Sequence, residues 1–220
     1  MENKLTKAQK ALLRQYFDLS ANLYGIISLG ELLKIYNSQN PPITKEQMAE
    51  FSEEIDNGNN NFFIINLDND EVDPMNREIV AEYIFIVKKE DEYEDYNMLK
   101  LVQGDKPYFV TRKEKMLRYA DDLYFEKTPE FLEMRSYLRN YSNLDKKRAD
   151  ELSEDIIFHT IISGCGIKSL EPLFSLFELK FKNSSIQLKF EELVVECMNN
   201  VRLHANRGFT DKELEKLSYV

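Results

Sequence analysis

The sequence predicts a mostly α-helical protein with an N-terminal winged-helix-like module and at most a small β-hairpin. Three observations predict this class: repeated helix-capping signals, apolar residues at spacings of three and four, and a shortage of turn-forming residues. The 220-residue chain has only seven Gly and six Pro, which disfavours a turn-dense all-β protein. With 43% hydrophobic and 31% charged residues, it has the composition of a folded domain that needs no disulfide or structural metal.

The first residues of several helices are marked by capping boxes. In such a box a Ser or Thr and a Glu or Gln three residues later satisfy each other's backbone amides. Two further starts combine a capping side chain with proline at the first helical position, at Asp73-Pro74 and Thr128-Pro129. The boxes precede helical apolar patterns at Thr6/Gln9, Ser28/Glu31, Thr44/Gln47, Thr111/Glu114 and Thr210/Glu213.

Residues 1–72 are predicted to form the winged-helix-like module. Three helices are expected there, one ending at Gly25, one over 29–36 and one from about Lys45. The best strand candidate is FFII at residues 62–65, closed by a turn at 68–70. This order of elements is that of a winged helix-turn-helix.

Residues 73–220 are predicted to form a larger helical body. Segment 79–87 (IVAEYIFIV) also suits a strand because it is rich in β-branched residues, so its assignment stays open. Phe174, Phe177 and Phe181 repeat at helical spacing and are predicted to be core. Helices are expected over 74–88, 95–103, 112–122, 129–140, 144–163, 170–181, 186–206 and 211–217.

Negative charge is concentrated between residues 53 and 95. This stretch holds fourteen acidic and three basic residues, a net charge of −11, whereas the whole chain carries −10. EDEYEDY at 90–96 is interpreted either as a solvated turn or as a contact surface for a basic protein partner. DNDEVD at 68–73 lacks the glycine and distal Glu of a calcium loop, so no metal is predicted. The predicted partner-binding residues are Asp91, Glu92, Glu94 and Asp95, with Tyr93 and Tyr96 as flat anchors.

The helix that would face DNA in a winged helix, TKEQMAEFSEEID at 44–56, is also acidic. It offers Lys45 against five carboxylates. A helix that reads DNA must approach phosphates and normally carries Lys and Arg. The sequence therefore indicates a protein-contact module rather than a DNA reader.

Catalytic equipment is not evident in the sequence. There is no GxxxxGK[ST], GxGxxG, GxSxG or HExxH motif. His159 lies on an apolar helix and is predicted to be a satisfied core residue, while Gly164 ends that helix with Cys165 tucked inward. A pairing of Cys165 with His159 or His204 is the alternative that would indicate an activated thiol. We predict a non-enzymatic protein without a cofactor.

The cysteine content and the N-terminus predict a cytoplasmic protein. Cys165 and Cys197 show no CxxC or Cys/His spacing and suit a reducing compartment. MENKLTKAQK lacks the apolar region of a secretory signal. No stretch reaches the roughly 18 uninterrupted apolar residues of a membrane helix.

NNVRLHANRGFTDKEL, residues 199–214, forms a polar cluster around Asn199, Arg202, Asn206 and Arg207. Most of it is explained as one helix closing at a left-handed Gly208 while the next helix opens. The asparagines are predicted to tie the last helix to the body through side-chain bonds to the backbone.

This closing segment, together with LYGII at 23–27 and KPYFVTRKEKMLRYAD at 106–121, resembles a group of uncharacterised bacterial helical proteins. The group comes mostly from low-GC Gram-positive organisms, and many members carry a SEC-C zinc tail. That tail is absent here, so no zinc role is implied. The resemblance implies a helical fold and a bacterial or phage setting, and it adds no catalytic residue.

The sequence as a whole favours a non-enzymatic binding or regulatory protein that uses the acidic stretch 53–95 to contact a basic protein partner. The alternative is a nucleic-acid-binding regulatory protein that uses basic helix ends. Its candidate residues are Arg202, Arg207, Arg112, Lys113 and Lys115.

Overall fold

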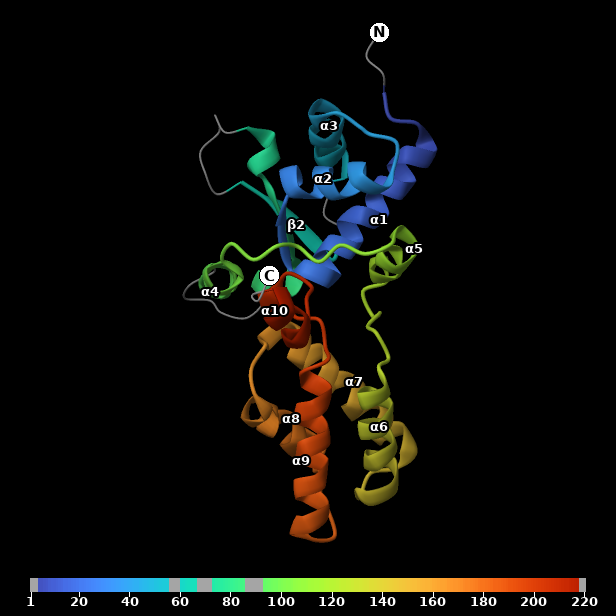
Figure 1. The fold of residues 1–220 in the computed structure, drawn as a ribbon, viewed down its shortest axis with the longest axis vertical. Coiled ribbons are helices and arrows are strands. Elements are labelled where there is room, and N and C mark those ends of the chain that lie inside the picture. The colour runs from blue at the N-terminus through green and yellow to red at the C-terminus, as the bar shows by residue number, and fades with distance from the viewer. Residues whose placement is uncertain (1–3, 56–59, 67–72, 86–92, 218–220) are drawn as a thin grey trace. The chain divides into compact units, whose positions relative to one another are not determined.

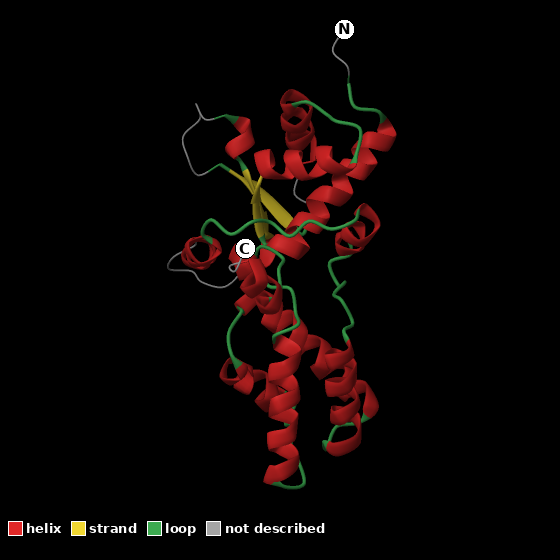
Figure 2. Cartoon of the chain, in the orientation of Figure 1, coloured by secondary structure: helices red, strands yellow, loops and turns green. Residues whose placement is uncertain are grey.

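The computed structural model describes residues 4–55, 60–66, 73–85 and 93–217. The predicted mostly α fold is confirmed, since the described residues form ten α-helices and one three-stranded sheet (Figures 1 and 2). The chain divides into two compact units, Met1–Tyr124 and Phe125–Val220. In the part of the chain that the structure describes, no helix has the length and hydropathy that a membrane crossing requires.

Three capped helices begin the first unit. They are α1 (Lys7–Tyr24), α2 (Leu29–Gln39) and α3 (Lys45–Ile55). The Thr6/Gln9 and Thr44/Gln47 boxes form as predicted, and the Ser28 hydroxyl accepts the amide of Glu31. Gly25 ends α1 with a φ of +71°, a backbone conformation that favours glycine.

The sheet of the first unit places its last strand in the middle. β1 (Ile26–Ser28), β2 (Phe62–Ile65) and β3 (Glu78–Ala81) are antiparallel in the order β1-β3-β2. The predicted FFII strand is confirmed as β2. The predicted helix over 74–88 is wrong, because Val80 is fully buried and pairs with Ile26 on one side and Phe63 on the other. Asp73 caps only the single turn η1 (Pro74–Asn76), and η2 (Glu82–Phe85) follows β3.

This central strand also bears on the domain boundary. The sequence predicted a boundary near residue 72, whereas the structure divides the chain after Tyr124. Because β3 lies between β1 and β2, it belongs with the N-terminal helices. The sheet consequently has three strands where the sequence indicated at most a hairpin.

The remaining segments of the first unit return to α1 and to the sheet. They are α4 (Glu94–Gln103), α5 (Lys113–Met116) and η3 (Leu117–Ala120). The Asn22 amide donates to the carbonyls of Tyr119 and Asp121, at 3.1 and 2.8 Å, and so fixes η3 against α1. The predicted Thr111/Glu114 box does not form, since α5 begins after Arg112 without a side-chain cap.

The second unit is built around three helices, α6 (Pro129–Tyr141), α7 (Lys146–Ser163) and α9 (Ser184–Met198). α6 packs against both α7 and α9. Their shared core includes the fully buried Met134, Leu138 and Leu152. Thr128 caps α6 as predicted, and Gly164 ends α7 in the left-handed region.

Two predicted helices of the second unit are shorter than expected. α8 spans only Glu171–Leu176, because Glu178 has a φ of +52° and the chain turns there. Phe177 is nonetheless buried, with Phe174 and Phe181 packed against the same core, so their core assignment is confirmed. The helix expected over 186–206 ends at Met198, and η5 (His204–Asn206) and α10 (Asp211–Leu217) follow.

Candidate protein-interaction site

α4 is attached to the sheet of the first unit by polar side chains. The Tyr96 hydroxyl donates to the carboxylate of Glu78 on β3, and the Lys100 ammonium lies 3.0 Å from the same carboxylate. Gln103 lies seven residues after Tyr96, on the same face of α4. Its side-chain amide donates to the Tyr24 carbonyl at 2.8 Å. Tyr96 and Gln103 are both buried, so these bonds fix the rotation of α4 about its axis.

Tyr96 and Lys100 hold their protons more tightly beside the Glu78 carboxylate. Burial, and then the hydrogen bond to Glu78, raise the pKa of Tyr96 to about 12. Burial lowers the pKa of Lys100, but its hydrogen bonds with Tyr96 and Glu78 outweigh this and raise its pKa overall. At neutral pH, Tyr96 and Lys100 therefore both keep the protons that they share with Glu78.

Aromatic rings join α4 to the strands beside it. The Phe85 ring lies 5.8 Å from that of Phe63 on β2, 5.9 Å from Tyr93 and 6.1 Å from Tyr96. Such offset and edge-to-face contacts stabilise a cluster beyond the area that it buries. Tyr93 is 42% exposed, whereas Tyr96 is 2% exposed. Of the two tyrosines predicted as flat anchors, only Tyr93 is accessible to a partner.

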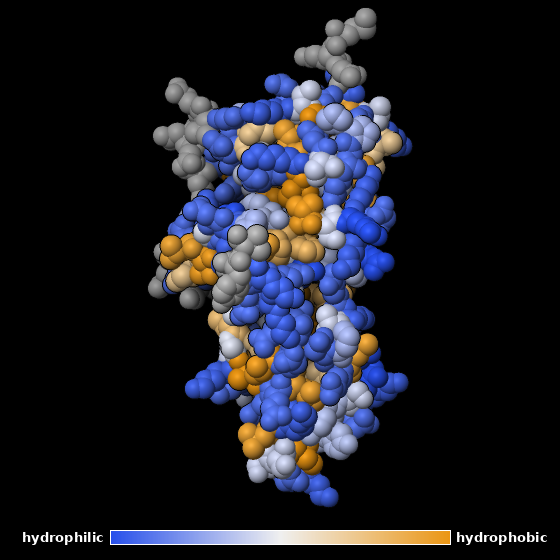
Figure 3. All heavy atoms as spheres, in the orientation of Figure 1, coloured by the Kyte–Doolittle hydropathy of each residue, from blue (hydrophilic) through white to orange (hydrophobic). Residues whose placement is uncertain are grey.

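The opposite face of α4 is apolar and open to solvent. Met98, Leu101 and Val102, here called the outer stripe, are 57%, 77% and 47% exposed. Their spacings of three and four place them on one side of the helix. Figure 3 shows hydrophobic residues gathered over α4 with hydrophilic residues around them. A helix of a globular protein normally buries its apolar stripe, so this reversed arrangement makes the outer stripe a candidate contact surface.

Exposed carboxylates lie at both ends of the outer stripe. Glu94 and Asp95 occupy the first turn of α4, where they also complement the helix dipole, and Asp105 follows Gly104 at the other end. The other two predicted partner-binding acids, Asp91 and Glu92, lie outside the described residues. The sequence predicted the helix and its acids but missed the outer stripe, because periodicity does not tell which face of a short helix is buried.

A polar pocket of about 460 Å³ lies beside α4. Its lining combines the Glu78 carboxylate and the Lys100 ammonium with amide side chains. These groups hydrogen-bond rather than react, so the pocket suits water or a small polar molecule. The lining residues are Ser28, Ile65, Asn66, Asn76, Glu78, Tyr96, Asn97 and Lys100.

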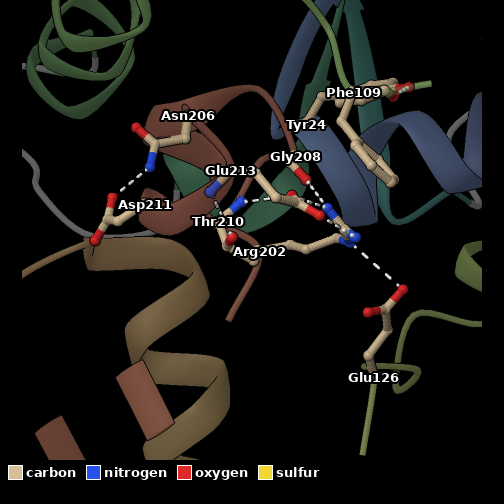
Figure 4. A network of polar contacts seen from close by, with 9 residues as sticks. All are labelled: Tyr24, Phe109, Glu126, Arg202, Asn206, Gly208, Thr210, Asp211 and Glu213. Carbon is tan, nitrogen blue, oxygen red and sulfur yellow. Dashed lines mark hydrogen bonds and ion pairs between the residues drawn. The ribbon is translucent and has the colours of Figure 1, made fainter. Parts of the chain in front are cut away.

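In the polar cluster near the C-terminus, the Arg202 side chain contacts Gly208, Glu213 and Glu126 (Figure 4). The guanidinium of Arg202 donates to the Gly208 carbonyl at 2.9 Å and to both carboxylate oxygens of Glu213, at 2.7 and 3.1 Å. A third carboxylate contact, with Glu126, measures 3.4 Å. The Arg202 side chain is only 9% exposed. It therefore joins the chain after α9 to α10 and is not presented to a ligand.

Asparagines complete this arrangement, here called the C-terminal brace (residues 199–213). The Asn206 amide donates to Asp211 at 2.6 Å, while the Asn200 amide donates to the Glu196 carbonyl at 2.7 Å. Arg207 adopts a φ of +49° and Gly208 a φ of +84°, which turns the chain into α10. Asn199 contributes its backbone amide to the Val195 carbonyl. The predicted Thr210/Glu213 box forms in both directions, at 3.2 and 3.1 Å.

Within the described ranges, His159 lies beside Ser169 and Cys165 lies at the surface, which gives no support to the alternative of a pair between Cys165 and a histidine. His159 Nε2 lies 3.1 Å from Ser169 Oγ, and that hydroxyl already donates to the Gly166 carbonyl. His159 therefore contacts Ser169, and the Cys165 thiol donates to the Ser163 carbonyl at 3.3 Å. Cys165 is exposed, so its predicted inward placement is wrong. Among the described residues, no group of three His, Cys, Asp or Glu side chains could hold a metal ion.

The basic residues of the alternative hypothesis lie in different surroundings. Arg112 and Lys115 are exposed at α5, but the Lys113 ammonium donates to the Asn40 side chain at 2.5 Å. Arg202 and Arg207 belong to the C-terminal brace in the other unit. The candidate basic residues thus belong to two different units of the chain.

No protein-family model, curated protein or solved structure matches this chain. The resemblance to bacterial proteins with a SEC-C tail stays a prediction. The function of the chain is therefore inferred from the geometry of α3, α4 and the C-terminal brace.

Proposed function

We propose that the chain is a non-enzymatic, cytoplasmic binding or regulatory protein whose first unit contacts a basic protein partner through exposed carboxylates. The observation that carries the proposal is the surface of α3. Its exposed acidic side chains outnumber the single exposed base of the helix, Lys45, although Arg77 and Lys10 pair with Glu53 and Glu54. Such a surface attracts Lys and Arg and disfavours phosphate. The exposed acids are Glu46, Glu50, Glu53 and Glu54.

The topology supports a winged-helix form for this module. The element order α1-β1-α2-α3-β2-β3 and the strand order β1-β3-β2 are those expected of a winged helix-turn-helix. In that fold α3 would occupy the position of the DNA-recognition helix. Because α3 is acidic here, we infer that the module uses this position for a protein contact.

Both free cysteines agree with a reducing compartment. Cys197 is buried and Cys165 is exposed, so neither contributes a disulfide within the chain. Burial raises the pKa of the Cys197 thiol to about 12, which keeps it protonated and unreactive.

The test is a nuclease-treated pulldown with two matched variants of the full chain. One variant neutralises exposed acids of the first unit, Glu46→Gln, Glu50→Gln, Glu94→Gln and Asp95→Asn. The control neutralises two exposed acids of the second unit, Glu133→Gln and Glu171→Gln. We expect a protein partner that survives nuclease, is lost with the first variant and is retained with the control.

The nucleic-acid alternative makes the opposite forecast. It predicts that the chain retains duplex DNA or RNA, with affinity that falls steeply as salt is added. It also predicts that Arg112→Gln and Lys115→Gln weaken this binding while the neutralised acids strengthen it. That outcome would overturn the proposed function.

A further inference from the structure

We propose that the outer stripe of α4 is a docking site for an amphipathic helix of the partner, one that carries Lys or Arg at both ends of an apolar stripe. The inference rests on the proposed function and adds the kind of partner. It concerns Met98, Leu101 and Val102 together with the carboxylates that flank them.

α4 cannot rotate about its own axis to bury the outer stripe. Its inner face is held by the Tyr96 contact with Glu78 and the Gln103 contact with the Tyr24 carbonyl. Turning the helix would break these bonds and leave buried polar groups unpaired, which costs more than the apolar side chains would gain. The outer stripe is therefore a fixed feature of the surface.

The order of side chains along α4 also supports this docking site. Glu94, Met98 and Leu101 follow one another at spacings of four and three on α4, and exposed Asp105 comes just after the helix end at Gly104, so carboxylates lie at both ends of the stripe. α4 itself, from Glu94 to Gln103, is about 15 Å long. A partner helix of similar length would match the acids with basic side chains at both ends of its apolar stripe.

The charges also select among possible occupants. An anionic membrane surface or a nucleic acid would be repelled by Glu94, Asp95 and Asp105. A second copy of α4 would bring like charges together at both ends of an antiparallel pair. A basic amphipathic helix satisfies both the apolar stripe and its acidic ends, in the manner of helices that dock with residues i, i+3, i+4 and i+7.

The experiment measures binding of three labelled peptides to the full chain by fluorescence anisotropy. The first peptide has a Leu stripe with Lys at both ends. The second peptide has the same composition, but its Leu residues are rearranged so that they form no stripe. The third peptide is the first with each Lys replaced by Glu. The chain is used as wild type, as Met98→Ser/Leu101→Ser, as Glu94→Gln/Asp95→Asn/Asp105→Asn, and as the control Leu176→Ser/Leu188→Ser, whose residues are 74% and 59% exposed.

We expect the first peptide to bind best and the Met98→Ser/Leu101→Ser variant to weaken it about tenfold or more, since central apolar anchors dominate small interfaces. The charge variant should weaken it mainly by slowing association. The control variant should bind like the wild type. Circular dichroism of each variant confirms that the fold is kept.

Four results would overturn the docking proposal. If the first two peptides bind equally and only the charge variant weakens them, the acidic surface works without a helix site and the proposed function survives. If no peptide binds, or if the Met98→Ser/Leu101→Ser variant binds like the control, the outer stripe is not the site. If light scattering shows a dimer that only this variant abolishes, the occupant is a second copy of the chain.

Discussion

α4 and the C-terminal brace are both polar helical segments that the sequence singled out, yet they use their charges in opposite ways. In the C-terminal brace, the Arg202 side chain is only 9% exposed, and its guanidinium contacts Glu213, Glu126 and the Gly208 carbonyl. On α4, the acids of the first turn point to solvent beside an exposed apolar stripe. One cluster stabilises its own unit, while the other is available to a partner.

The difference teaches that residue type alone does not distinguish a binding surface from a structural network. The sequence explained the Asn/Arg-rich end mostly as a helix closure and kept its arginines as the alternative nucleic-acid site, and Arg202 and Asn206 each find a partner within about a dozen residues. The α4 acids looked like a solvated turn, but they flank Met98 and Leu101, which have been left outside the core. Substitutions should therefore affect stability at the C-terminal brace and binding at α4.

The largest expected effect is on stability at the C-terminal brace. Arg202→Ala removes the bidentate contact with Glu213 and leaves partly buried carboxylates without their cation. We expect a loss of about 3 kcal/mol in the free energy of unfolding, measured by urea denaturation followed by circular dichroism. The matched control is Lys147→Ala, an exposed pair on α7, which should stay within about 0.5 kcal/mol. Equal losses in the two variants would contradict the distinction.

A smaller loss is expected where α4 meets the sheet. Tyr96→Phe keeps the buried ring but removes the hydroxyl that donates to Glu78. We expect about 1–2 kcal/mol of destabilisation in the same urea measurement, because a half-buried carboxylate loses one donor. Tyr141→Phe, at an exposed ring on α6, should leave the midpoint unchanged. An unaffected Tyr96→Phe protein would show that the inner face of α4 is not held by this contact.

The outer stripe should be nearly neutral for folding. Met98→Ser/Leu101→Ser is expected to change the free energy of unfolding by less than about 0.5 kcal/mol, because both side chains are mostly exposed. A thermal melt with the Leu176→Ser/Leu188→Ser control checks this. A large destabilisation would mean that the stripe packs within the chain, and it would remove the separation between binding and stability.

The smallest effect concerns pH at the surface of the C-terminal brace. A hydrogen bond from Lys212 lowers the pKa of Glu196 below its ordinary value of 4.5. The contact between Glu196 and Lys212 therefore contributes fully to the free energy of unfolding above about pH 4.5. This contribution is lost as the pH falls through the lowered pKa of Glu196. In Lys212→Gln, an NMR titration should show the pKa of Glu196 moving up toward 4.5. An unchanged pKa would show that the pair is not formed in solution.

Much of the fold follows from local signals. The Thr6/Gln9, Thr44/Gln47 and Thr210/Glu213 boxes and Gly25 mark real helix ends, because capping involves residues within one turn of each other. The mostly α class, the FFII strand and the closure of α7 at Gly164 were predictable for the same reason.

The sequence by itself determined where several of the helices begin, how acidic the 53–95 stretch is and that the Asn/Arg-rich end is polar. Only the tertiary structure decided that β3 enters the middle of the sheet, since its partners Ile26 and Phe63 are distant in sequence. It also decided that the Arg202 side chain is mostly buried and that Leu101 is exposed. Burial depends on which surfaces pack together in the folded chain. The spacing of apolar residues along the sequence does not show which surfaces these are.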